Sequence, residues 1–102
     1  MLVADLINAL QKRGLSPQLW PAQAQLLDVD LVRACFDSRR VQPGDIFCAI
    51  PGHSQQGADF IQSALDAQAS MLLVDQVREQ FSCPQLVVGE ELALTAAHCA
   101  DL

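Results

Sequence analysis

The sequence is poor in basic residues and has no long apolar run. Its 102 residues include 6 Lys and Arg against 12 Asp and Glu, which gives a net charge of −6. Nonspecific binding to nucleic acid or to an anionic membrane needs a basic surface, so we expect neither partner. A membrane-spanning helix needs about 20 apolar residues in a row, and the apolar runs of this sequence are only a few residues long.

Clustered metal ligands and targeting signals are also missing. The segment Met1–Gly14 lacks the charged start and the apolar stretch of a secretory signal peptide. No two cysteines are spaced as CxxC, and the two histidines are isolated, so we expect no metal site. Buried free thiols are compatible with a reducing compartment, which favours a cytoplasmic protein. The four cysteines are Cys35, Cys48, Cys83 and Cys99.

Two nucleotide-binding fingerprints do not occur. The sequence contains no GxxxxGK[ST] segment and no GxGxxG segment. The chain therefore has neither a P-loop nor a dinucleotide-binding turn of the usual kind. No nucleophile lies beside a general base in the sequence, so we predict no catalytic residue.

Hydrophobic periodicity predicts one α/β domain. Val3, Leu6 and Leu10 recur at helical spacing ahead of a glycine stop at Gly14. Short apolar runs alternate with helical patterns further on, which predicts a mostly parallel sheet with flanking helices. We expect strands at 31–36, 46–50, 71–74 and 86–88, helices at 59–68 and from 90 onward, a connector at 15–28 and a helical turn at 77–81.

The segment from Phe36 to Gly57 has the residue types that suit a small anionic ligand. Ser38 follows a predicted strand, where α/β sheets present ligand contacts, and its hydroxyl could donate to a phosphate or a uracil carbonyl. The alternative is a local turn in which Asp37 or Ser38 bonds nearby backbone N–H groups. His53, in a glycine-flanked polar loop, is either a ligand contact or an ordinary surface residue.

Three of the six basic residues lie within eight positions, at Arg33, Arg39 and Arg40. In an acidic chain, such a cluster can hold a small anion. The alternative is that these arginines form ordinary surface ion pairs with neighbouring aspartates. The candidate partners are Asp30, Asp37 and Asp45.

A linked set of motifs gives this segment a specific resemblance. The motifs are Asp37-Ser38-Arg39, Pro43-Gly44-Asp45, Phe47-Cys48-Ala49, Gly52-His53, Gln56-Gly57 and Phe60-Ile61. In this order the chain resembles the amino-terminal domain of the Mur ligases, most of all the members that add the third residue of the peptidoglycan stem peptide. The resemblance is strong over residues 31–75. It departs at Gln56, where the family usually has aspartate, and at Gln68-Ala69-Ser70, where it usually has Gly-Ala.

The resemblance implies that residues 1–102 are the UDP-binding domain of a longer, three-domain enzyme whose ATPase and carboxy-terminal domains are absent. The predicted last helix reaches Leu102 without a stop signal, as expected for part of a longer chain. The complete enzyme would be an ATP-dependent acid–amino-acid ligase that uses ATP and magnesium, and this fragment alone would be inactive. The implied partners are UDP-N-acetylmuramoyl-L-alanyl-D-glutamate and the ATPase domain of the same protein.

The resemblance also implies a set of UDP-sugar contacts, with Arg39 and Arg40 available to offset diphosphate charge. Two alternatives remain open: the sister ligase that adds D-alanyl-D-alanine, and a stand-alone, non-catalytic module that binds a nucleotide sugar or a protein. The implied contacts are Phe36, Ser38, Arg39, Gly52, His53, Ser54, Gln55, Gln56 and Gly57.

Overall fold

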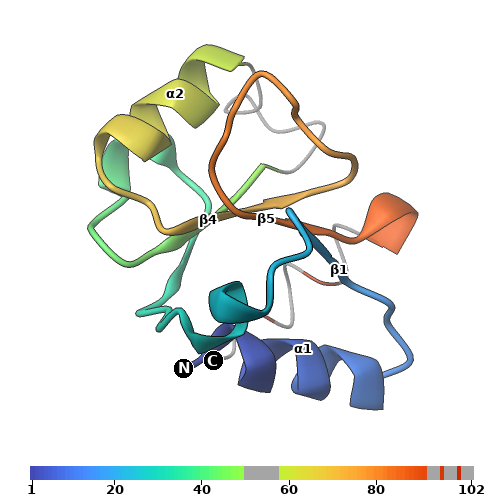
Figure 1. The fold of residues 1–102 in the computed structure, drawn as a ribbon. Coiled ribbons are helices and arrows are strands. Elements are labelled where there is room, and N and C mark those ends of the chain that lie inside the picture. Colours follow the sequence, from blue (N-terminus) through green and yellow to red (C-terminus); the bar gives the residue numbers. More distant parts are fainter. Residues whose placement is uncertain (50–57, 92–94, 96–98, 100–102) are drawn as a thin grey trace.

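The computed structural model describes residues 1–49, 58–91, 95 and 99 (Figure 1). Within them the chain forms a five-stranded sheet in the order β1-β5-β4-β3-β2. Strands β2 to β5 pair in parallel, and β1 pairs antiparallel with β5. The predicted α/β class is confirmed. The elements are α1 (Val3–Lys12), β1 (Gln18–Trp20), η1 (Ala24–Asp28), β2 (Ala34–Cys35), η2 (Ser38–Arg40), β3 (Ile46–Cys48), α2 (Ala58–Asp66), β4 (Met71–Val74), β5 (Gln85–Val87) and η3 (Gly89–Glu91), where η marks a 3-10 helix.

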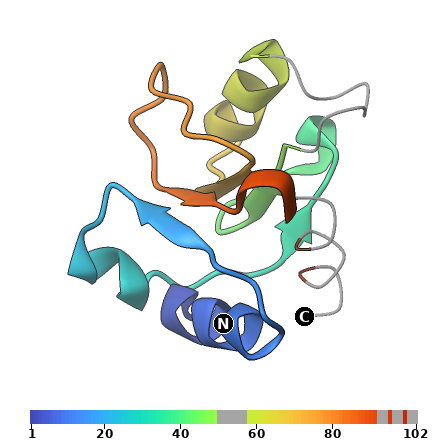
Figure 2. The ribbon, with the colours of Figure 1, turned by 90° about the vertical axis from the view of Figure 1, so that its right-hand side faces the viewer.

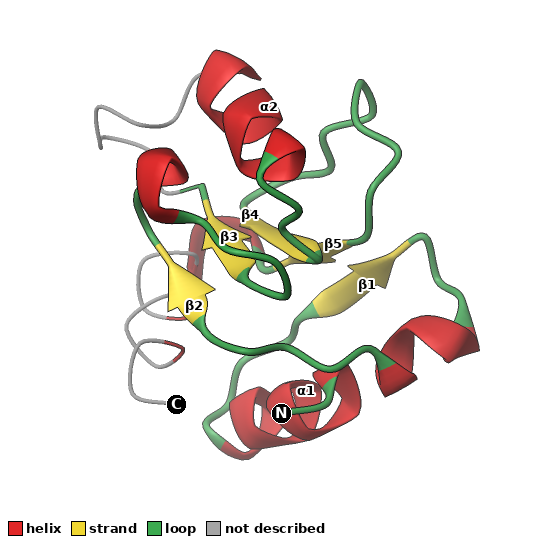
Figure 3. Ribbon diagram, turned by 90° about the vertical axis from the view of Figure 1, so that its left-hand side faces the viewer, coloured by secondary structure: helices red, strands yellow, loops and turns green. Residues whose placement is uncertain are grey.

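The sheet has a helix on each face, as Figure 3 shows for α1 and α2. Every residue of β3 and β4 is buried, which is the pattern of central parallel strands covered on both sides. Because side chains alternate along a strand, Ile46 and Cys48 pack on the α1 side, whereas Phe47 packs on the α2 side. No helix in the described ranges is long and apolar enough to cross a membrane.

The first helix forms as its periodicity predicts. Val3, Leu6 and Leu10 are its buried residues, and Gly14 has a φ of +82° just after the helix ends. The N–H of Gly14 donates to the carbonyl of Gln11, so the glycine stop closes the last turn. The three buried residues of this helix belong to the core cluster on the α1 side of the sheet.

The connector predicted at 15–28 was wrong in part, because it contains β1 and the 3-10 helix η1 (Figure 2). Residues Gln18–Trp20 pair with Gln85–Val87 and add an antiparallel edge to the sheet. The three residues of β1 lie between two prolines, Pro17 and Pro21, too short a run for periodicity to reveal. The pairing depends on a strand that lies more than sixty positions away in the chain.

Strand β2 is shorter than the predicted 31–36. Only Ala34 and Cys35 belong to the strand, opposite Ile46 and Phe47. Val32 and Arg33 still bond toward β3, because the N–H of Val32 donates to the carbonyl of Gly44 and the carbonyl of Arg33 accepts the N–H of Ile46. Further back, the N–H of Leu31 donates to the carbonyl of Met1, so the amino-terminal segment is the partner there. Apolar residues alone do not show where this change of partner falls.

The last strand, predicted at 86–88, begins one residue earlier, at Gln85. Gln85 is fully buried, and its amide Nε2 donates to the carbonyls of Arg78 (2.9 Å) and Phe81 (3.2 Å). Its Oε1 accepts the N–H of Arg78 at 2.8 Å. Residues 77–81 therefore form a turn tied to β5, in place of the predicted helical turn.

The remaining elements follow their predictions closely. Strand β4 matches 71–74, and β3 begins at Ile46 as expected and ends at Cys48. Helix α2 ends at Asp66, two residues early, and Gln68 has a φ of +71°. The helix predicted from Glu90 begins as η3, and Thr95 and Cys99 are helical and buried, whereas the residues around them lie outside the described ranges.

We expect Gly44→Ala to destabilise the chain more than Gly14→Ala. Both glycines have left-handed backbone, at φ of +91° and +82°, so each alanine costs about 1–2 kcal/mol of unfolding free energy. A Cβ at position 44 would in addition lie 2.6 Å from Cγ2 of Val32, whereas nothing lies within 4 Å of a Cβ at position 14. Urea denaturation measures both losses.

Val32→Ala provides the control for this comparison. It should recover part of the extra loss in the Gly44→Ala background and none of the loss in the Gly14→Ala background. Equal losses for the two alanine variants would contradict the close approach at Gly44.

Candidate functional site

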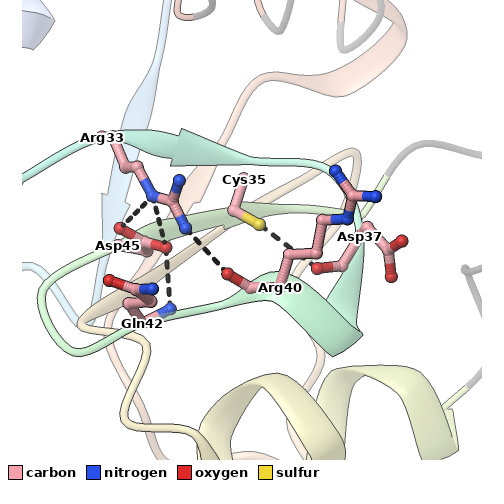
Figure 4. Close-up of polar contacts among 6 residues, drawn as sticks. All are labelled: Arg33, Cys35, Asp37, Arg40, Gln42 and Asp45. Atoms are coloured by element: carbon pink, nitrogen blue, oxygen red, sulfur yellow. Dashed lines mark hydrogen bonds and ion pairs between the residues drawn. The ribbon is translucent and has the colours of Figure 1, made fainter.

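A compact polar turn, η2, follows β2. Asp37 precedes it and accepts the N–H of Arg39 at its Oδ1 (2.9 Å), while its carbonyl accepts the N–H of Arg40 (2.9 Å). The thiol of Cys35 also donates to that carbonyl, at 3.2 Å (Figure 4). This is the local turn that the sequence left open as an alternative, because a short acidic side chain takes backbone N–H groups that no strand partner uses.

Arg39 pairs with the same aspartate. Its Nε donates to Oδ1 at 3.1 Å and its Nη2 to Oδ2 at 3.0 Å, a two-pronged contact. The hydrogen bond from the Arg39 side chain lowers the pKa of Asp37 below its ordinary 3.8, and the same bond raises the pKa of Arg39. The charge of Arg39 is thus largely offset within the turn.

A second acid–base pair lies behind the turn. Asp45 is fully buried, and both of its carboxylate oxygens accept from Nε of Arg33 at 3.2 Å. Its Oδ2 also accepts the N–H of Gln42 at 2.9 Å. Nη2 of Arg33 continues to the carbonyl of Arg40 at 2.7 Å (Figure 4). One guanidinium therefore connects the start of β3 with the end of η2.

The three clustered arginines differ in their ion-pair partners. Arg33 and Arg39 are each paired with an aspartate, as the ion-pair alternative predicts. The third aspartate considered, Asp30, contacts the amino group of Met1 instead. Among the described residues, the guanidinium of Arg40 has no ion-pair partner, and it acts on Asp37 only through its charge.

Three of the nine predicted ligand contacts lie within the described residues. Phe36 is partly buried and packs against the core on the α1 side, Ser38 is only 4% exposed, and the side chain of Arg39 is 77% exposed. They are brought together because they are nearly consecutive at the end of β2. The other six, Gly52, His53, Ser54, Gln55, Gln56 and Gly57, lie outside the described residues, and all nine assignments stay predictions.

Two hollows in the described surface lie away from these residues. One, of about 170 Å³, is bounded by the amino-terminal segment and the start of β2, including Met1 and Val32. The other, of about 530 Å³, lies beside β1 and is lined by residues such as Leu19 and Leu27. Neither is lined by Phe36, Ser38 or Arg39, so the hollows do not bear on the predicted contacts.

Asp45 is the functional candidate that sequence analysis underrated. The sequence indicates it as a surface ion-pair partner and as the last residue of the Pro43-Gly44-Asp45 motif, whereas it is fully buried. Its place directly after Pro43-Gly44 was the available signal, because a polar residue between a tight turn and an apolar strand often bonds back to the turn. Burial of a carboxylate requires partners, and the fold supplies them from Arg33 and Gln42.

The cysteines are structural thiols. Burial raises the pKa of Cys99 to about 11 and raises the pKa of Cys48 still further, so neither is a ready thiolate at neutral pH. Cys83, partly buried, also has a raised pKa because of burial. Over the described ranges, no group of three or more His, Cys, Asp or Glu side chains could hold a metal ion.

The fold and the turn at the end of β2 define an α/β domain that presents a polar strand end. A family model described as "Mur ligase family, catalytic domain" matches residues 34–97. The chain belongs to the Mur ligase family.

Curated proteins of this family share the region. The chain is 36% identical over 94 residues to a UDP-N-acetylmuramoyl-L-alanyl-D-glutamate--2,6-diaminopimelate ligase of Chromobacterium violaceum, covering 84% of this chain and 19% of that protein. It is 42% identical over 60 residues to a ligase of the same name from Coxiella burnetii (57% of this chain, 12% of that protein). A Haemophilus influenzae ligase of that name is 46% identical over 46 residues (45% and 9%). The chain thus spans a fifth or less of these relatives.

The Asp37–Arg39 pair gives a testable pH dependence. Because the folded-state pKa of Asp37 is lowered, the pair stabilises the fold above the ordinary pKa of 3.8. That stabilisation is lost as the pH falls through the lowered pKa of the folded state. NMR titration of the Asp37 carboxyl carbon should give a midpoint below 3.8.

Two arginine variants test the cause of this shift. In Arg39→Gln the midpoint of Asp37 should rise most of the way to its ordinary value, because the main hydrogen bond is lost. In Arg40→Gln the rise should be small, because Arg40 acts only through its charge. Equal effects of the two variants would show that the hydrogen bond from the Arg39 side chain does not govern the pKa of Asp37.

Proposed function

We propose that this chain holds the UDP end of UDP-N-acetylmuramoyl-L-alanyl-D-glutamate within a longer, ATP-dependent ligase of peptidoglycan synthesis. The observation that carries the proposal is the match, over 84% of the chain, to a ligase whose name contains this substrate. The match to the Mur ligase family over residues 34–97 supports the same class of reaction.

The geometry of the sheet supports the place of the ligand. Strands β2 and β3 are parallel neighbours, so their carboxyl ends lie at the same edge. Ligands of open α/β sheets bind outside the carboxyl ends of the strands. Phe36 and Ser38 follow β2, and the segment with His53 follows β3 in the sequence, which is the order that a shared UDP site needs.

The charges refine the predicted contacts. Arg39 is already bonded twice to Asp37, whereas the guanidinium of Arg40 has no ion-pair partner within the described part of the chain. A diphosphate gains more from a cation that is not already neutralised. We therefore assign the contact with the diphosphate to Arg40 before Arg39, with Ser38 and His53 as directional hydrogen-bond donors.

In such a ligase this domain would act by positioning. Binding the remote nucleotide end holds the D-glutamyl carboxyl in place for activation by ATP and for attack by the amine of the incoming amino acid. No residue of this chain is assigned to ATP or to magnesium, which we place in the rest of the enzyme. The identity of the added amino acid is likewise assigned to the rest of the enzyme.

Steady-state kinetics of the full-length ligase test this role. Ser38→Ala, His53→Ala and Arg40→Ala should each raise KM for the nucleotide substrate about tenfold, with a smaller loss in kcat, because each removes one hydrogen bond or charge from a remote binding group. Arg39→Ala is the matched control for Arg40→Ala and should change KM less. A large loss in kcat with unchanged KM would overturn the assignment.

A further inference from the structure

Among the described residues, the side chain of Arg33 links η2 to the start of β3. Its Nε contacts both oxygens of Asp45 at 3.2 Å, and its Nη2 donates to the carbonyl of Arg40 at 2.7 Å. Arg33 is not one of the predicted UDP contacts. We propose that Arg33 is a positioning residue, which fixes the turn carrying Ser38 and Arg40 for the ligand; this inference rests on the proposed function.

The anchor of this arrangement is the buried carboxylate of Asp45. A buried carboxylate is stable only with hydrogen-bond or charge partners, and the described partners here are Arg33 and the N–H of Gln42. The backbone around Asp45 is fixed as well, because its N–H donates to the carbonyl of Gln42 and its carbonyl accepts the N–H of Ser70. The carboxylate therefore holds the Arg33 guanidinium at a defined place.

The other end of the guanidinium acts on η2. The carbonyl of Arg40 belongs to the last residue of a three-residue 3-10 helix, where carbonyls have no partner within the helix. A cationic donor at this end satisfies the carbonyl and suits the partial negative charge there. The bond at 2.7 Å is short for an N–H···O contact, as expected for a charged donor.

The two ends of the turn are held differently. The first end is local, because the carboxylate of Asp37 accepts the N–H of Arg39. At the second end, the N–H of Arg40 closes the turn on the carbonyl of Asp37, and the carbonyl of Arg40 is held by Arg33, seven positions away. Loss of Arg33 would therefore loosen the turn at Arg40 while leaving the bond between Asp37 and Arg39 in place.

Lysine cannot reproduce this geometry. The guanidinium of arginine presents several donors in a rigid plane, so it contacts Asp45 and Arg40 at the same time. A lysine ammonium is a single point charge that pairs with Asp45 and leaves the carbonyl of Arg40 unbonded. Arg33→Lys thus keeps the charge beside the buried carboxylate and removes the bond to the turn.

The test uses amide hydrogen exchange and UDP titration on the 102-residue chain, with kinetics on the full-length ligase. In Arg33→Lys, exchange of the Arg40 amide should rise about tenfold, because the turn opens more readily at Arg40 once its carbonyl has lost a hydrogen bond of typical strength. The Arg39 amide, bonded to Asp37, should rise less. The dissociation constant for UDP, and KM in the ligase, should rise about tenfold with kcat nearly unchanged.

Arg78→Lys is the matched control. It makes the same replacement at another Arg–Asp contact, between Nη2 of Arg78 and Asp75 at 3.2 Å, that does not involve η2. It should leave exchange at Arg40 and binding of UDP unchanged. If Arg33→Lys and Arg78→Lys gave the same exchange at Arg40, the positioning role would be wrong.

Failure of this inference and failure of the proposed function give different results. One outcome separates the two: Ser38→Ala weakens the binding of UDP, whereas Arg33→Lys raises amide exchange at Arg40 and leaves the binding of UDP unchanged. The proposed function would then stand, and the positioning role would be overturned. If the wild-type chain and the full-length ligase both failed to bind UDP, the proposed function and the positioning role would fall together. Raised exchange at Arg40 would then show only that Arg33 holds the turn.

Discussion

The polar part of this domain depends on one buried carboxylate. Asp45 lies at the point where the Pro43-Gly44 turn enters β3, and it is fully removed from solvent. A carboxylate in that place is costly unless it is paired, so its partners must be in position whenever the chain is folded. That requirement fixes the guanidinium of Arg33, and through it the carbonyl at the end of η2.

Around this point the fold is governed by apolar burial. The sheet is covered by α1 on one face and α2 on the other, so its central strands have no room for polar side chains. The exception is Gln85, at the start of β5, where all of its amide groups are used to hold residues 78–81. The other buried polar residues in the described part of the chain, Ser38, Asp45 and Thr95, lie outside the strands.

The three-dimensional arrangement decides which arginines near the turn form ion pairs. The sequence presents three arginines close together in an acidic chain, which suggests one basic patch. In the structure Arg33 forms an ion pair with the buried Asp45, and Arg39 forms one with Asp37. The turn then has one guanidinium, that of Arg40, that forms no ion pair with an aspartate in the described part of the chain. The proposed anionic ligand is for this reason assigned to that one residue before the others of the cluster.

The sequence by itself determined the α/β class, the helix α1 with its glycine stop, the core strand β4 and the Mur ligase resemblance, which the family match confirms. These follow from local periodicity and from linked motifs. Only the tertiary structure decided that β1 joins the sheet, that β2 is two residues long and that Asp45 is buried. Each depends on a partner outside the local run of residues: β5 is more than sixty positions from β1, and Arg33 is 12 positions from Asp45. The ligand contacts assigned to residues 52–57 are predictions from the sequence alone. The bond from Arg33 to Arg40 could be found only in three dimensions.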